Sequence, residues 1–481
     1  MTSTHTPRSA SARVVTRTDG PRPAFLDRPL ASFYLVVGSG VALLALGLLM
    51  VASASSVDSM VDGGSPYDIF ARQALWVLLG LPAMWLGMRL RPASFRRLAY
   101  PGLIVSLVLL GAVLVPGIGV RYNGARSWFD LGPMSLQPSE LAKLAFVFWG
   151  ADLLVRKRKR LGEWRHLLVP LVPIAVLLVL LVTLQPDLGT SMCFLLILLG
   201  LLWTVGAPAR LFAVLLVAAV GSVAAIIAME PYRLVRVTSF LDPFADPEGA
   251  GMQAVRGMYA LATGGWWGVG LGNSRMKWGL LPNQDSDYIF AIIGEELGFV
   301  GCLFVLGLYG TLAYAGLRIA RRTADPFIRL TAAAVTVWLV GQASINIGYV
   351  VGLLPVTGIP LPLISTGGTS LVLTMFVMGM LASFARHEPQ AVAALKQRGP
   401  SRLARLLWIP VPRSAVDAPT RRRPRGTAAR PRGAPPRTGG AASPRTGGAA
   451  PRTERPARPH PAARGRGPAG SAPPPSTQRR R

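Results

Sequence analysis

Long stretches without a single charged side chain are the feature that most limits how this 481-residue chain can fold. The clearest is "LLVPLVPIAVLLVLLVTL" at residues 167–184, and about 20 such residues are enough to cross a bilayer as a helix. The chain is therefore expected to be an all-α polytopic membrane protein. Similar blocks predict about ten spanning helices, near residues 31–52, 70–88, 98–116, 138–155, 166–184, 188–206, 211–229, 288–316, 327–353 and 370–385.

Basic residues are concentrated towards the two ends of the chain. Only 15% of the residues are charged, yet the formal net charge is +29, and residues 401–481 carry 19 arginines against two acids. Segments so rich in arginine, proline and small residues bury too little apolar surface to fold. We therefore divide the chain into a disordered N-terminus (1–29), a membrane domain (30–388) and a disordered tail (389–481).

The basic tail has several conceivable partners. It lacks the aromatic residues and recognition motifs that accompany nucleic-acid binding, so no nucleic-acid partner is expected. Attraction to anionic lipid headgroups is the simplest interpretation of such a segment. Docking to another protein remains the alternative.

The segments between the apolar blocks alternate in charge. One set, such as "RLRPASFRR" and "RKRKRLGEWR", is short and basic, and the positive-inside rule places it in the cytoplasm with both termini. The other set then faces outward, at 53–69, 117–137, 185–187, 230–287 and 354–369. The longest outward loop, 230–287, lies between the predicted seventh and eighth helices, and its Trp266 and Trp267 are suited to the membrane interface.

Four acids surround the start of the predicted eighth helix. In "LPNQDSDYIFAIIGEELG" (281–298), Asp285 and Asp287 precede the apolar run, whereas Glu295 and Glu296 lie inside it. An ionisable group in hydrocarbon costs roughly 2.5–3.5 kcal/mol, so such residues indicate a functional site by default. With a rise of about 1.5 Å per residue, Glu295 is expected about 12 Å deeper than Asp287.

The expected depths of these acids in the membrane favour different roles for them. Asp287 can meet the outer surface, where a partly apolar setting would raise the pKa of its carboxyl group and suit it to act as a general base. Glu295 and Glu296 are expected to be structural, bonded to helix starts or basic partners. No Walker loop, zinc ligand set or nucleophile elbow occurs in the chain.

Polar residues of three outward segments are further candidates. Glu140 and Lys143 are spaced to share one face of a helix, and Arg126 and Lys143 are expected at the outer surface, where an anionic headgroup would lie. Asp187 starts an apolar helix, so both a capping role and a site role are open. The prolines and glycines of 354–369 prevent a continuous helix, and non-helical backbone at membrane depth usually lines a cavity.

Five segments together resemble the SEDS family, which includes FtsW, RodA and SpoVE. They read "NGARSWFDLGPMSLQPSELAKL", "QPDLGT", "YRLVRVTSFLDPFADPEGAGMQ", "SDYIFAIIGEELGFVG" and "LPVTGIPLPLISTGGTS", in the order of the family. The stretch "GLGNSRMKWGLLPN" is more similar to the division-specific FtsW branch, although a sporulation paralogue remains an alternative. The resemblance implies a ten-helix membrane glycosyltransferase that polymerises lipid II beside a class B penicillin-binding protein.

The resemblance also implies a set of site residues. The essential carboxylate of the family corresponds to Asp287, which would deprotonate the acceptor hydroxyl in an inverting transfer. The chain departs from the family pattern at Asp285, usually an uncharged or histidine residue, and at Thr366, usually aromatic. A protein-held metal is not expected, although Mg or Mn is a possible cofactor. The expected substrate-binding residues are Arg126, Glu140, Lys143, Asp187, Arg233, Lys277, Ser365, Gly367 and Gly368.

Two other functions remain open at this stage. A transporter that flips lipid II would also need a cavity, cations and intramembrane carboxylates, but we find no convincing inverted repeat. A scaffold would act through its tail on division proteins such as FtsZ. In each case the protein is expected in the inner membrane and enriched at the division septum.

Overall fold

The computed structural model describes residues 25–56, 65–122, 125–130, 132, 135–215, 217–218, 221, 239–399 and 402–412. All of them belong to one compact unit, Met1–Pro419, and the second unit, Thr420–Arg481, lies outside the described residues. The longer helices are α1 (Ala31–Ala54), α3 (Asp68–Arg89), α4 (Pro92–Leu114), α5 (Pro138–Arg156), α7 (Leu171–Thr183), α8 (Leu188–Val205), α11 (Met252–Gly264), α12 (Ile289–Arg322), α13 (Pro326–Val350) and α14 (Gly368–Ala385). Shorter helices are η1 (Phe25–Asp27), η2 (Arg158–Arg160), α6 (Trp164–Leu168), α15 (Pro389–Arg398) and α16 (Arg402–Leu406).

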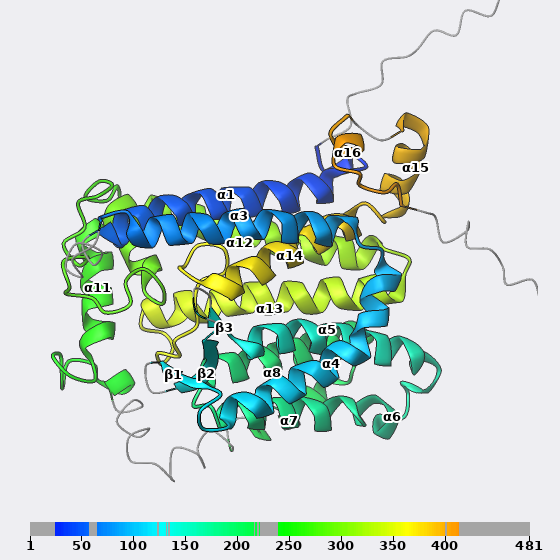
Figure 1. Cartoon of the computed structure of the whole chain (residues 1–481), viewed down its shortest axis with the longest axis horizontal. Coiled ribbons are helices and arrows are strands. Elements are labelled where there is room, and N and C mark those ends of the chain that lie inside the picture. Colours follow the sequence, from blue (N-terminus) through cyan, green and yellow to red (C-terminus); the bar gives the residue numbers. More distant parts are fainter. Residues whose placement is uncertain are drawn as a thin grey trace, which may run out of the picture. The chain divides into compact units, whose positions relative to one another are not determined.

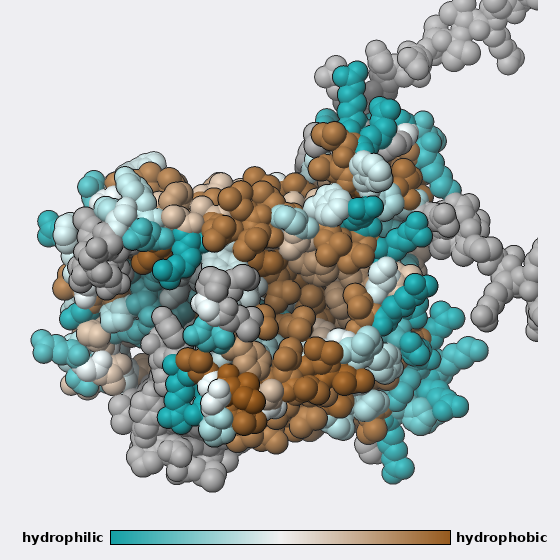
Figure 2. All heavy atoms as spheres, in the orientation of Figure 1, coloured by the Kyte–Doolittle hydropathy of each residue, from teal (hydrophilic) through white to brown (hydrophobic). Residues whose placement is uncertain are grey.

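The prediction of a helical membrane protein is confirmed. Eight helices in the described part of the chain are long and apolar enough to cross a membrane. Brown apolar surface covers the middle of the face in Figure 2, and hydrophilic side chains gather towards both ends of the helices. The predicted span 211–229 lies largely outside the described residues. The bounds of the eight helices are 31–54, 68–89, 92–114, 165–183, 188–205, 289–322, 326–350 and 368–385.

Helix α5 is where the prediction expected a span, but it is not among these eight. It carries Glu140, Lys143, Asp152 and Arg156, which is more charge than a lipid-facing helix tolerates. Sixteen of its residues are buried, from Pro138 to Leu154. Because its neighbours α4, α8, α13 and α14 cover it, α5 crosses the interior of the bundle rather than its surface.

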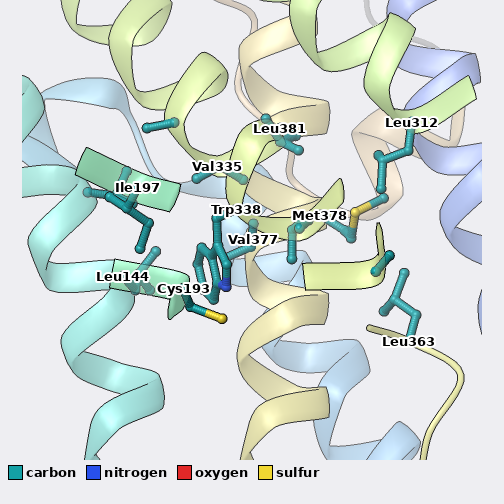
Figure 3. Close-up of a cluster of buried hydrophobic side chains, with 14 of the residues drawn as sticks. Leu144, Cys193, Ile197, Leu312, Val335, Trp338, Leu363, Val377, Met378 and Leu381 are labelled. Atoms are coloured by element: carbon teal, nitrogen blue, oxygen red, sulfur yellow. The ribbon is translucent and has the colours of Figure 1, made fainter. Parts of the chain in front are cut away.

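Close packing joins the helices around α5. Figure 3 shows the Trp338 ring among Leu144, Cys193 and Val335, side chains that come from α5, α8 and α13. Because lipid is as apolar as these side chains, packing rather than exclusion from water must hold the helices together. Small residues permit this packing where α3 meets α14: a Cβ at Gly379 would collide with the carbonyl group of Met84.

The two ends of the bundle differ in structure. One end, called here the sheet end, carries α11 and a small antiparallel sheet made of β1 (Val120–Tyr122), β2 (Ala125–Asp130) and β3 (Ser135–Leu136). The opposite end, called here the basic end, carries η2, α6, α15 and α16 (Figure 1). The sheet was not predicted. Helices α15 and α16 also form regular structure at 389–398 and 402–406, within the predicted disordered tail.

Helix α12 is not one straight helix, and this corrects the predicted depth of its acids. Gly298 has φ 68° and ψ −168°, so the chain changes direction there. The preceding segment, 289–297, packs along α11, with Gly264 against the carbonyl group of Gly294. In Figure 1, α11 lies across the ends of the long helices. Glu296 accepts a hydrogen bond from Ser53, in the last turn of α1. The glutamates therefore lie at the sheet end, and not deep among the spanning helices as predicted.

Candidate active site

The candidate site forms where two irregular segments meet the last turns of α13. The Asn346 side-chain amide donates to the Asp287 carbonyl oxygen over 2.9 Å and to the Ile359 carbonyl oxygen over 2.8 Å. The Tyr349 hydroxyl lies 3.0 Å and 2.9 Å from the same two oxygens. These two α13 side chains therefore hold the backbone that precedes α12 against the loop 354–367.

Asp287 is the last residue but one before α12, and its carboxylate lies beside that loop. A Cβ built on Gly358 would be 3.7 Å from Asp287 Oδ2. Burial, together with the negative charges of Asp285 and Asp187, raises the pKa of Asp287 to about 6. A pKa near 6 leaves the carboxylate ionised at neutral pH and much more basic than an ordinary aspartate, as a general base requires.

The neighbouring Asp285 is tied to the loop as well. The Thr366 hydroxyl lies 3.1 Å from Asp285 Oδ2, and the Thr366 backbone N–H donates to the Asp285 carbonyl oxygen over 3.0 Å. Ser365 Oγ donates to the Ser286 carbonyl oxygen over 2.6 Å. The two positions that depart from the family pattern, Asp285 and Thr366, are thus in direct contact with each other.

The sequence left a capping role and a site role open for Asp187, and its position is compatible with both. It is the N-cap of α8, because its Oδ1 accepts from the Thr190 backbone N–H over 2.9 Å and its Oδ2 from the Thr190 hydroxyl over 2.7 Å. The Gln137 side-chain amide also donates to Asp187 Oδ2, over 3.2 Å. The same carboxylate is close enough to Asp287 to raise its pKa, so the cap contributes to the electrostatics of the site.

Lys143 is buried, which corrects its expected position at the outer surface. Its side chain is 2% exposed and pairs with Glu140 over 2.9 Å. The Lys143 ammonium also lies 4.9 Å from the centre of the Trp338 ring, a cation–π contact. Glu140 in turn lines a small pocket together with Ser365 and Gln342. The pair compensates its own charge inside the bundle, and Lys143 faces Glu140 rather than open solvent.

Arg126 and Lys277 have separate surroundings. Arg126 lies on β2 and donates through Nη1 to the Leu114 carbonyl oxygen over 3.3 Å, while its buried Nε has no partner in the described part of the chain. The Lys277 ammonium donates to the Gly272 carbonyl oxygen and lies 3.9 Å from Glu296 Oε1. Arg233, the remaining cation of the predicted set, lies outside the described residues.

Lys277 belongs to a cluster that supports the loop before α12. Glu295 accepts from the Ser274 hydroxyl over 2.5 Å and from the Arg275 backbone N–H over 2.9 Å. Glu296 accepts from the Ser53 hydroxyl over 2.6 Å. Both glutamates therefore bind polar groups of segments at the sheet end, which matches the structural role expected for them.

Gly367 and Gly368 position the start of α14. The Gly367 N–H donates to Gln73 Oε1 over 3.4 Å, and Gln73 Nε2 donates to the Ser365 carbonyl oxygen over 3.2 Å. A Cβ at Gly368 would lie 2.7 Å from the Trp76 ring. A larger residue at Gly368 would push the start of α14 away from α3, whereas a Cβ at Gly367 would meet the Ser370 hydroxyl of α14 itself.

Sequence reasoning missed Asn346, Tyr349, Gln73 and Gln137. Each is a polar side chain within or next to an apolar helix, and that contrast was the available signal. Their partners lie far away in the sequence, so the signal did not reveal which groups they bind. Within the described ranges, no group of three or more His, Cys, Asp or Glu side chains lies close enough together to hold a metal ion.

The eight apolar helices of the described part of the chain and a partly buried carboxylate between loops at one end define a polytopic membrane protein with a site near the ends of its spanning helices. The chain belongs to the FtsW/RodA/SpoVE family, whose profile, described as "Cell cycle protein", matches residues 34–390. The predicted family is thereby confirmed.

Individual relatives are similar over most of the chain. It is 49% identical over 389 residues to the "Probable peptidoglycan glycosyltransferase FtsW" of Mycobacterium tuberculosis, covering 81% of this chain and 74% of that protein. It is 37% identical over 345 residues to the stage V sporulation protein E of Bacillus subtilis, covering 72% and 94%.

Two solved structures share the fold. One belongs to a study of a peptidoglycan synthase complex that coordinates polymerization and crosslinking, with a TM-score of 0.62, 32% identity, and coverage of 73% of this chain and 96% of that one. The other is the rod shape determining protein RodA of Thermus thermophilus, with a TM-score of 0.54, 29% identity, and coverage of 74% and 97%.

Proposed function

We propose that this protein is a peptidoglycan glycosyltransferase that polymerises lipid II into glycan strands during septal wall synthesis. The observation that carries the proposal is Asp287, a carboxylate with a pKa of about 6 held between two loops at the sheet end. The similarity to proteins named peptidoglycan glycosyltransferase FtsW supplies the substrate class.

The proposed mechanism is a single inverting displacement. Transfer from an α-linked diphosphate donor to a β-linked product needs one base for the attacking hydroxyl group and no carboxylate nucleophile. Asp287 takes the proton of the acceptor 4-hydroxyl as the oxygen attacks the anomeric carbon, and the diphosphate leaves with the bonding electrons. Because the leaving group is already charged, cations matter more to it than a general acid does.

The diphosphate and the base occupy different subsites in this proposal. Asp187 and Asp285 give the surroundings of Asp287 a negative charge that would repel a diphosphate. Arg126, whose buried Nε has no partner in the described part of the chain, is proposed to bind the diphosphate. Arg233 is proposed as a second cation. Lys143 acts with Glu140 beneath the site, and we derive no step through a metal ion.

The orientation follows from the charge of the two ends. Arginine and lysine favour the cytoplasmic side of a membrane, so the basic end is proposed to be cytoplasmic and the sheet end outward. This orientation presents Asp287 to sugars outside the membrane. A class B penicillin-binding protein is the proposed partner, and the septum the proposed location.

Reconstitution tests the proposal. The purified protein would be combined with its class B partner and lipid II, and glycan polymer would be measured for wild type, Asp287→Asn and the neighbouring control Asp285→Asn. We expect polymer from wild type and from the control, and none from Asp287→Asn. Polymer from Asp287→Asn would remove the proposed base. If no variant polymerises but lipid II crosses liposome membranes, the protein is a transporter instead.

A further inference from the structure

A groove opens at the basic end, far along the helices from Asp287. It has a volume of about 390 Å³ and lies between the last turn of α8, the last turns of α12 and the first turns of α13. The residues that line it and that matter here are Trp203, Leu317, Ala320, Arg321, Arg329 and Ala333. This volume falls in the range of small-molecule sites, which is roughly 300–1,000 Å³.

The groove is apolar in its depth and cationic at its rim. On α12, Leu317 precedes Arg321 by one turn and Ala320 directly precedes it, and on α13, Ala333 follows Arg329 by one turn. Residues four apart share a helix face, so both helices place an arginine nearer the basic end than the apolar lining. The two alanines keep the groove open where longer side chains would fill it.

Charge is not compensated within this groove. Arg321 and Arg329 are exposed, and in the described part of the chain neither forms an ion pair with an acid. Arg329 donates through Nη2 to the Thr323 carbonyl oxygen over 3.4 Å. Two guanidinium groups that line one groove repel each other, and an anion with several oxygens would satisfy their donors.

Apolar surface continues from the groove into the membrane-spanning part of the bundle. Trp203 is 54% exposed at the end of α8, where a tryptophan is favoured at the level of lipid headgroups. Tyr314, one turn before Leu317 on α12, is 48% exposed. A ligand bound here would meet cations at one end and an apolar helix surface at the other.

We propose that the α8–α12–α13 groove binds one anionic phospholipid of the leaflet at the basic end. Its phosphate group binds Arg321 and Arg329, and an acyl chain packs on Leu317, Ala320 and Ala333. Basic pockets between spanning helices hold anionic headgroups in this way. The site is independent of the proposed glycosyltransfer, because it shares no residue with the candidate active site.

Lipid binding can be measured directly on the purified full-length protein in detergent. The probe is dioctanoyl phosphatidylglycerol, with dioctanoyl phosphatidylcholine and inorganic phosphate as comparisons, and the readouts are the dissociation constant and the melting temperature. We expect phosphatidylglycerol to bind at least about tenfold tighter than phosphatidylcholine and to raise the melting temperature. We expect inorganic phosphate to do neither. Equal effects of free phosphate and phosphatidylglycerol would show a free-anion site and overturn the lipid proposal.

Matched charge variants locate the site. Arg321→Gln with Arg329→Gln should weaken phosphatidylglycerol binding at least about tenfold. The control, Arg158→Gln with Lys159→Gln, removes the same charge from exposed residues of η2 outside the groove and should leave binding unchanged. Unchanged binding by the groove variant, or equal loss in the control, would contradict the proposal.

A spectroscopic measurement does not depend on those variants. Phosphatidylglycerol with brominated acyl chains should quench part of the tryptophan fluorescence, and Trp203→Phe should remove that part. Quenching that is identical in wild type and Trp203→Phe would place the lipid elsewhere.

Discussion

The side-chain amide of Asn346 donates to the backbone carbonyl oxygen of Asp287 over 2.9 Å, although 59 positions separate the two residues in the chain. Tyr349 adds a second donor to the same oxygen. The carboxylate is thus positioned through its backbone by α13, and the loop 354–367 is held by the same two side chains.

Loss of this anchor should lower activity without changing the base itself. Tyr349→Phe removes one hydroxyl donor while keeping the ring, and we expect a loss of about 1 kcal/mol in stability and a several-fold lower kcat. The pH dependence of polymerisation should stay the same, because the carboxylate is untouched. Tyr314→Phe on the exposed surface of α12 is the control. A displaced pH profile in Tyr349→Phe would mean that Tyr349 acts on the charge of Asp287 rather than on its position.

Asp287→Asn should abolish polymerisation and yet stabilise the fold. Burial and the charges of Asp285 and Asp187 raise the pKa of this carboxyl group from 3.8 to about 6, so its ionisation disfavours the folded state. The resulting loss in the free energy of unfolding is absent below pH 4 and grows between pH 4 and 6. It is complete above pH 6, where it amounts to at most about 3 kcal/mol. The melting temperature of the variant should therefore exceed that of wild type at pH 7.5 and match it near pH 4. A lower melting temperature at pH 7.5 would refute this account.

The acid limb of the pH–activity profile should report the same carboxyl group. Activity should rise with pH through about 6, as Asp287 loses its proton. Asp285→Asn removes a like charge that raises this pKa, so the limb should move to lower pH. The asparagine carbonyl can still accept from Thr366, which makes the substitution mild. An unmoved limb would show that Asp285 does not act on Asp287.

Gly298→Ala should destabilise the protein, in contrast to Gly307→Ala. The φ of 68° and ψ of −168° at Gly298 disfavour any side chain by roughly 1–3 kcal/mol, and a Cβ there would collide with the backbone of Gly268. Gly307 lies in the regular part of α12 with nothing within 4 Å of a built Cβ. Thermal unfolding of both variants compares the two positions. Equal melting temperatures would mean that the break in α12 is not required.

The sequence predicted the helices well and their interruptions poorly, for a physical reason. Spanning helices are set by local apolarity, which is visible in any block of about 20 residues. The break at Gly298 depends on packing against the segment 265–270, which no local pattern contains. The depth assigned to Glu295 failed on this point, because the calculation assumed a continuous helix.

In the candidate site, too, the features set by local sequence were predictable and those set by contacts between distant segments were not. Asp287 could be proposed from its position before an apolar run and from the family resemblance. Its partners could not, because Asn346 and Tyr349 meet it only after α13 has folded against the loop. Lys143 was placed at the outer surface because it lies near the start of a helix that follows an outward loop, whereas the structure buries it with Glu140 and Trp338.

The buried charges of α5 have a consequence for how the chain enters the membrane. A helix that carries Glu140, Lys143 and Asp152 is a poor substrate for insertion on its own, because each charge is costly in lipid. The groups that stabilise these charges in the folded protein include the Trp338 ring on α13, which contacts Lys143 and is synthesised much later than α5. Biogenesis therefore has to shelter α5, beside α4 or within the insertion machinery, until the second half of the chain arrives. Truncation before α13 should leave α5 accessible to water-soluble labelling reagents.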